Sequence, residues 1–100
     1  MTMMWVLQAI TPEAGSLAFL LGPASVKTVG RAPRADFVLD APLVSRLHCR
    51  LEAGDHSLEV VDLSSTNGIY VNGKRVKRAP LSIGDTLRVG RVEFEIRRHE

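Results

Sequence analysis

The sequence predicts an all-β sandwich, and three observations support this fold class. No long segment shows helical periodicity, whereas many short runs are rich in β-branched and apolar residues. Glycine, proline, asparagine and aspartate separate these runs at the short spacing typical of strands joined by turns. In the longer runs apolar and polar residues alternate, as in a strand with one buried face. We therefore expect roughly ten short strands in two packed sheets.

The first half of the chain contains apolar runs that end in turns marked by glycine or proline. We expect strands over residues 4–10, 17–21, 26–29 and 37–39. The run 17–21 is too short for two helical turns, so a buried strand is favoured over a helix. Pro42 keeps the residues around it out of a helix, so 43–46 should form a loop.

In the second half the alternation is clearest from residue 48 to residue 53. Cys49, Leu51 and Ala53 are expected on one, apolar face, opposite His48, Arg50 and Glu52. Further strands are expected over 58–63, 69–71, 87–89 and 92–96. The pairs Asn67-Gly68 and Asn72-Gly73 predict tight turns on both sides of 69–71, and Pro80 predicts a break.

Length and charge favour a small binding module over an enzyme. One hundred residues can bury a single core but leave little room for a deep catalytic cleft as well. The net charge of +2 suits an anionic partner. Dense basic runs typical of a nucleic-acid arm are missing, and the stretch 74–78 is better explained as a charged sheet edge.

The single cysteine, Cys49, excludes an internal disulfide and a cysteine pair for zinc. A reducing compartment is the simplest setting, so we expect a cytoplasmic protein. The N-terminal residues lack the basic leader and small-residue cleavage site of a signal peptide, and no apolar run approaches membrane-spanning length. We therefore expect no contact with a membrane.

Three polar side chains outside the predicted strands have the chemistry of a phosphate receptor. Arg31 and Arg46 provide guanidinium groups, and Ser45 provides a hydroxyl. These donors suit a phosphate, whose oxygens accept several hydrogen bonds at once.

The motifs around these donors resemble the forkhead-associated (FHA) domain family. The resemblance comprises Gly30-Arg31, Ser45-Arg46-Leu47-His48, Ser65-Thr66-Asn67-Gly68, Val71-Asn72-Gly73 and the segment from Gly84-Asp85 to Gly90, in this order. It implies that residues 1–100 are a single FHA domain. The implied fold is a sandwich of two twisted, mainly antiparallel sheets with about eleven short strands and the binding loops at one end.

The resemblance also assigns roles to individual residues. Arg31 would contact the phosphate of a phosphothreonine, Ser45 would donate its hydroxyl and loop amide, and Arg46 would add a contact. Thr66 would help to hold the loop and the phosphate, and Asn67 would bind the main chain of the peptide. Structural support of the binding loops is expected from Gly30, His48, Gly68, Asn72 and Gly73. Leu43, two residues before the serine, would select an aliphatic residue three positions after the phosphothreonine.

Catalytic and metal-binding interpretations are disfavoured. Ser45, His48 and Asp62 include the residue types of a hydrolytic triad, but no Gly-x-Ser-x-Gly elbow is present. Cys49 is expected as a small buried hydrophobe and not as a reactive thiol. The three histidines lie in different segments without ligand spacing. We predict no catalytic residue, no metal and no cofactor.

The sequence thus predicts a monomeric, phosphothreonine-dependent peptide-binding module that acts downstream of a Ser/Thr kinase. One alternative is an FHA-fold interaction domain that binds an unphosphorylated partner or self-assembles. The intact donors Arg31, Ser45, Arg46 and Asn67 argue against it. Nucleic-acid binding through 74–78 is disfavoured because no aromatic platform accompanies these basic residues.

Overall fold

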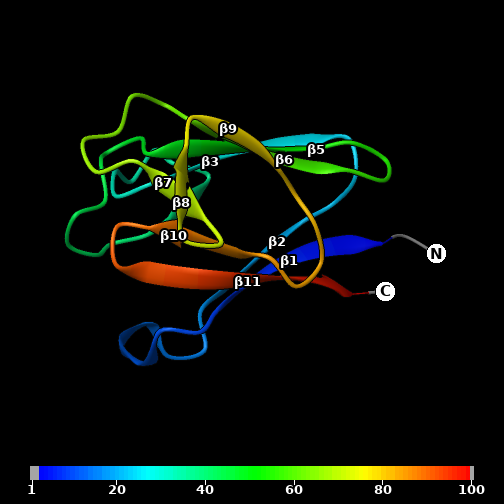
Figure 1. Ribbon diagram of the computed structural model, residues 1–100, viewed down its shortest axis with the longest axis horizontal. Coiled ribbons are helices and arrows are strands. Elements are labelled where there is room, and N and C mark those ends of the chain that lie inside the picture. Colours follow the sequence, from blue (N-terminus) through cyan, green and yellow to red (C-terminus); the bar gives the residue numbers. More distant parts are fainter. Residues whose placement is uncertain (1–2, 100) are drawn as a thin grey trace.

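The computed structural model describes residues 3–99, which form eleven strands and one short 3-10 helix (Figure 1). The elements are β1 (Met4–Ala9), η1 (Pro12–Ala14), β2 (Ala18–Leu21), β3 (Ser25–Gly30), β4 (Phe37–Val38), β5 (Cys49–Ala53), β6 (Leu58–Asp62), β7 (Ile69–Val71), β8 (Lys74–Val76), β9 (Arg78–Leu81), β10 (Thr86–Val89) and β11 (Val92–His99). The prediction of an all-β sandwich is confirmed. No helix within residues 3–99 is long and apolar enough to span a bilayer.

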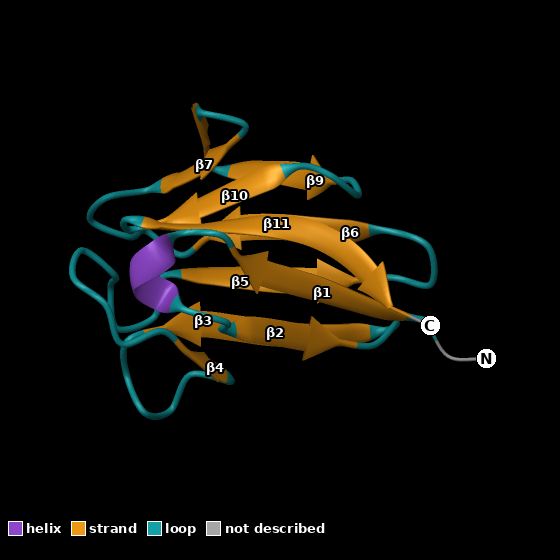
Figure 2. Ribbon diagram, turned by 90° about the horizontal axis from the view of Figure 1, so that it is seen from below, coloured by secondary structure: helices purple, strands orange, loops and turns teal. Residues whose placement is uncertain are grey.

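The strands form two sheets that pack face to face. One sheet has the order β2-β1-β11-β10-β7-β8, and the other has the order β4-β3-β5-β6-β9. Pairing is antiparallel except between β3 and β4, which are parallel. Figure 1 shows the two layers, with both chain ends at one end of the sandwich and the long loops at the other. Figure 2 shows that η1 lies at the loop end.

The core lies between the inner faces of the two sheets. Apolar side chains at alternate positions point inward, so Trp5, Leu7 and Ala9 of β1 are buried. At one side the sheets are joined by aromatic contacts. Phe19 of β2 stacks on Phe37 of β4 with ring centroids 4.7 Å apart, and Phe94 lies 5.4 Å from Phe19. These rings fix the edge strand β4 and hence the start of the loop that follows it.

The two Asn-Gly pairs have different structures. Asn72 and Gly73 have φ angles of 52° and 83° and connect β7 to β8, which pair as a hairpin. The prediction of a tight turn at Asn67-Gly68 is wrong, because β6 and β7 belong to different sheets. Gly68 has a positive φ of 77°, but Asn67 does not share it, and the chain crosses between the sheets in a wider loop.

Pro80 does not break the structure as the sequence suggested. It lies inside β9 opposite Glu59. Because β9 is an edge strand, one of its sides has no neighbouring strand, and a proline, which lacks a backbone N–H, is tolerated where that N–H would point to this open side. The basic stretch 74–78 runs from β8 to β9, the free edges of the two sheets. Arg78 pairs with Glu52 and Glu59, and the hydrogen bond to Glu59 raises the pKa of Arg78.

Candidate functional site

Three loops meet at the end of the sandwich opposite the termini. They join β3 to β4, β4 to β5, and β6 to β7. Between them lies an open depression of about 390 Å³, lined by Arg31, Leu43, Val44, Ser45, Thr66 and Asn67. The structure therefore brings together four of the five residues predicted to contact a phosphopeptide. The fifth, Arg46, is exposed on the same loop as Ser45 but does not line the depression.

Arg31 is anchored through its backbone and through one nitrogen of its side chain. Its backbone N–H donates to the Ser45 carbonyl at 3.0 Å, and its Nε donates to the Val44 carbonyl at 3.1 Å. The Nη groups find no hydrogen-bond acceptor within residues 3–99. The guanidinium is thus oriented by its stem while its outer donors stay free for an anion in the depression.

Gly30 permits the close approach of two of these loops. A β-carbon at this position would overlap the Arg46 carbonyl and lie 2.9 Å from the Leu47 Cα. The neighbouring N–H of Ala32 donates to that same carbonyl at 3.0 Å. The absence of a side chain at Gly30 therefore lets the loop of Arg31 lie directly against the loop of Ser45.

Hydrogen bonds also tie the β6–β7 loop to the loop that carries Ser45. The Thr66 N–H donates to the Ser45 Oγ at 3.1 Å, which leaves the hydroxyl proton of Ser45 free to be donated. The Asn67 Nδ2 donates to the Leu43 carbonyl at 3.0 Å. Asn67 was expected to bind the peptide main chain; in this structure one of its amide hydrogens holds the Leu43 loop, and its Oδ1 has no partner within residues 3–99.

His48 lies beneath these loops and connects them. Its Nδ1 accepts the Ser45 N–H at 3.0 Å, and its Nε2 lies 2.8 Å from the Gly68 carbonyl. A carbonyl only accepts, so Nε2 carries the proton and donates. The ring contacts the amide of Ser45 and not its hydroxyl, so it cannot act as a base for that hydroxyl. Alternation placed His48 on the polar face opposite Cys49, but both are fully buried, because His48 precedes β5 and the loops cover it.

Two further side chains shape the loops, although the sequence indicated no role for either of them. The Ser65 Oγ donates to Asp62 and accepts the Gly68 N–H at 2.9 Å, which gives the β6–β7 loop its curve. Asp36 accepts hydrogen bonds from the backbone and the hydroxyl of Thr28, and these bonds lower the pKa of Asp36. The spacing Asp62-x-x-Ser65 is typical of side-chain-capped turns and is the signal that could have identified the first of them.

Asn72 was expected to brace the binding loops, and the structure shows different partners. Its Nδ2 donates to Asp85 at 3.0 Å, and its Oδ1 accepts the Thr86 N–H at 2.9 Å. Gly68 and the binding loop precede β7, whereas Asn72 follows the other end of this strand. Asn72 and Gly73 therefore shape the β7–β8 hairpin and the turn before β10.

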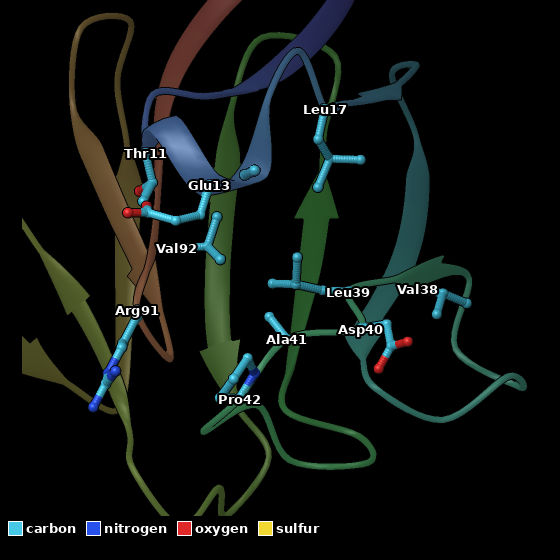
Figure 3. A pocket seen from close by; sticks show the side chains of 11 residues that line it. Thr11, Glu13, Leu17, Val38, Leu39, Asp40, Ala41, Pro42, Arg91 and Val92 are labelled. Carbon is cyan, nitrogen blue, oxygen red and sulfur yellow. The ribbon is translucent and has the colours of Figure 1, made fainter.

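A larger hollow of about 730 Å³ lies beside the depression, and Figure 3 shows the residues that line it. Side chains of the β1–β2 loop, the segment 38–42 and the β10–β11 turn surround it. Most are apolar, and the charged ones are Arg91 and the two carboxylates of Glu13 and Asp40, which would repel a phosphate. None of the six residues that line the smaller depression is acidic, so the depression around Arg31 is the better anion site.

No group of three or more His, Cys, Asp or Glu side chains within residues 3–99 is placed to hold a metal ion. Cys49 is fully buried in the core, and burial raises the pKa of its thiol to about 12. It therefore stays protonated at neutral pH and is a poor nucleophile.

Comparison with known proteins identifies relatives of this chain. The family model described as the FHA domain matches residues 27–90. The oxoglutarate dehydrogenase inhibitor of Corynebacterium diphtheriae and the glycogen accumulation regulator GarA of Mycobacterium tuberculosis are each 41% identical to this chain over 80 residues, which is 80% of the chain. The matched region covers 54% and 48% of those relatives, so the chain spans about half their length.

Solved structures agree with the sequence matches. An FHA domain studied for its phosphothreonine-dependent interactions superposes with a TM-score of 0.87 at 30% identity, covering 97% of this chain and 98% of that one. The FHA domain of a Chlamydia trachomatis protein superposes with a TM-score of 0.86 at 28% identity, covering 93% and 95%. The fold, the order of the motifs and these matches lead to one conclusion: the chain belongs to the FHA domain family.

Proposed function

We propose that this domain binds a phosphothreonine-containing segment of a partner protein. The observation that carries the proposal is the convergence of the unpartnered Nη groups of Arg31, the Ser45 hydroxyl and the polar groups of Thr66 and Asn67 on one depression whose lining residues include no acidic one. A phosphate carries about −1.5 to −2 charge near neutral pH and three acceptor oxygens, so it matches these convergent donors. Arg46, exposed on the same loop, would add its charge at the margin.

The expected affinity is modest and therefore switchable. Charge-assisted hydrogen bonds contribute about 1.5–3 kcal/mol each, so three of them contribute about 4.5–9 kcal/mol. The entropy of ordering the peptide reduces this total, so binding is micromolar at the tightest. Burial of the extra methyl group favours phosphothreonine over phosphoserine by about 0.8 kcal/mol, near fourfold. The restricted rotamers of the β-branched residue add to this preference.

In the cell such a domain couples a Ser/Thr kinase to a second protein. Two relatives are named as an inhibitor and a regulator, which agrees with a binding and regulatory role and not with catalysis. For this chain we infer that a kinase creates the ligand and that the domain, as a cytoplasmic monomer, recruits or restrains the phosphorylated protein.

A phosphopeptide array tests the proposal. The same peptides are presented with threonine, phosphoserine and phosphothreonine, and bound protein is quantified for each form. We expect binding to the phosphothreonine form, weaker binding to phosphoserine and none to threonine. Equal binding to all three forms would instead support an FHA-fold domain that recognises an unphosphorylated partner.

A further inference from the structure

Two arginines and a tyrosine form a row across the outer face of the six-stranded sheet. Tyr70 of β7 pairs directly with Arg75 of β8 on one side and with Arg88 of β10 on the other. Direct cross-strand partners point to the same face of a sheet, so the three side chains are neighbours. This face is the outer one, since Ile69 and Leu87, the residues adjacent to Tyr70 and Arg88, are fully buried in the core. We call these three residues the arginine row.

The row reaches the edge of the proposed phosphopeptide site. The Arg75 side chain lies over Gly68, where an added β-carbon would lie 2.5 Å from its Nε and 2.9 Å from its Cζ. Gly68 directly follows Asn67, which lines the depression. An extended peptide advances about 3.3 Å per residue, so a segment anchored in the depression can reach Arg75 within a few residues.

Neither of the two arginines is engaged in an ion pair within the part of the chain that the structure describes. In contrast, Arg50, Arg78 and Arg97 each pair with a glutamate. Arg88 also buries its Nε without a hydrogen-bond partner. Glu93 lies opposite Arg88 on β11 but is exposed and makes no ion pair with it. The row is therefore a surface with two unpaired cations.

Tyr70 orients one of these cations in advance. The Arg88 Cζ lies 4.0 Å from the centre of the Tyr70 ring, a cation–π contact that fixes the plane of the guanidinium. An arginine held in a fixed plane presents two parallel N–H groups, which suit a carboxylate. Because the guanidinium covers one face of the ring, the aromatic surface open to a nucleobase is reduced, and an oxyanion is the better ligand.

We propose that the arginine row binds acidic side chains of the same protein ligand that places its phosphothreonine in the depression. This inference rests on the proposed function, and it adds a second recognition element. The row would let the domain distinguish phosphothreonines that lie near aspartate or glutamate from those in neutral surroundings.

Paired phosphopeptides test the role of the row. All peptides carry one phosphothreonine and a leucine three residues after it. In one, a run of aspartates lies before the phosphothreonine, and in a second it lies beyond the leucine; each has a counterpart with asparagines. Affinities are measured by fluorescence polarisation for the native domain and for Arg75→Gln, Arg88→Gln and Lys77→Gln. Lys77 is exposed between β8 and β9, outside the row, so it controls for loss of net charge.

Of the two aspartate peptides, we expect the one whose aspartates lie on the side of the row to bind more tightly than its asparagine counterpart. The expected difference in affinity is about three- to fivefold at low salt, as exposed charge pairs allow. Arg75→Gln and Arg88→Gln should remove this preference without changing the affinity for the asparagine peptides. Lys77→Gln should keep the preference. Raising the salt concentration should weaken the preference in the native domain, because exposed charges are screened.

Other outcomes overturn the inference in distinguishable ways. If phosphothreonine peptides bind but neighbouring aspartates change nothing, or if the preference survives both row substitutions, the row has no such role and the proposed function stands. If single-stranded oligonucleotides bind in a manner that requires Arg75 and aspartates have no effect, the row serves nucleic acid. If the native domain binds no phosphothreonine peptide, the proposed function and this inference both fail.

Discussion

The imidazole of His48 joins the amide of Ser45 to the carbonyl of Gly68, at 3.0 Å and 2.8 Å. One buried ring thus sets the spacing of two loops that are far apart in sequence. A neutral histidine can donate with one nitrogen and accept with the other, which few side chains of this size can do. The position of the Ser45 hydroxyl therefore depends on a side chain that is fully buried.

Replacing His48 with alanine should lower both stability and phosphopeptide affinity. The change leaves a buried N–H and a buried carbonyl without partners and opens a cavity, at a cost of about 3–5 kcal/mol of unfolding free energy. Urea unfolding and peptide titration of His48→Ala check this, with His56→Ala, an exposed histidine in the β5–β6 turn, as the control. Equal behaviour of the two variants would show that the ring does not hold the loops.

Gly30 and Gly73 provide a matched pair of glycine-to-alanine changes. At Gly30 the added methyl collides with the Arg46 backbone, so the Arg31 loop must shift, with a loss of about 1–3 kcal/mol in stability and a clear loss of phosphothreonine affinity. At Gly73 the space is open, but φ is 83°, so Gly73→Ala costs about 1–2 kcal/mol in stability alone. Thermal unfolding and binding to a peptide without acidic neighbours check both. A Gly30→Ala domain with native affinity would contradict the role given to this contact.

Leu43 should set a preference for an aliphatic residue three positions after the phosphothreonine. It lines the depression, and 46% of its surface is exposed, so its side chain is open to a ligand. An oriented phosphothreonine peptide library should enrich leucine, isoleucine or valine at that position, and Leu43→Arg should shift the selection toward acidic residues. Enrichment of aspartate by the native domain would reject this assignment.

The Cys49 thiol should be inert in the folded domain. Burial raises its pKa to about 12, so at pH 8 almost no thiolate exists and reagents cannot reach the sulfur. A thiol reagent should label one cysteine per chain only after denaturant is added. Because the folded pKa lies above the unfolded one, the contribution of the buried thiol to stability is complete below about pH 9 and is lost as the pH rises toward 12. Rapid labelling of the native protein would contradict this burial.

Local patterns in the sequence predicted most of the strands, and the failures have physical causes. Alternation located β5 and β11, and Asn72-Gly73 located a hairpin, because these signals depend on neighbouring residues alone. The same dipeptide at Asn67-Gly68 gave a wrong prediction of a tight turn, because two strands form a hairpin only if they join the same sheet, and β6 and β7 do not. The burial of His48 likewise depends on distant loops that cover it.

The candidate site was less accessible from local patterns than the strands were. The chemistry of Arg31 and Ser45 pointed to phosphate, but their approach to each other depends on the tertiary contact between Gly30 and the Arg46 backbone. The family resemblance supplied that information. It did not indicate Asp36, whose hydrogen bonds with Thr28 fix the β3–β4 loop, or the partners of Asn72, because such contacts join residues without a common motif.

The most direct test of phosphothreonine recognition is calorimetric titration of a phosphothreonine peptide into the native domain, Arg31→Ala and Arg34→Ala. Arg34 is exposed on the same loop as Arg31 but does not line the depression. Loss of the central guanidinium should cost about 2–5 kcal/mol, at least thirtyfold in affinity, while the fold is kept and Arg34→Ala binds as the native domain does. Binding by Arg31→Ala within about threefold of the native affinity, a change under 1 kcal/mol, would contradict the central role of Arg31.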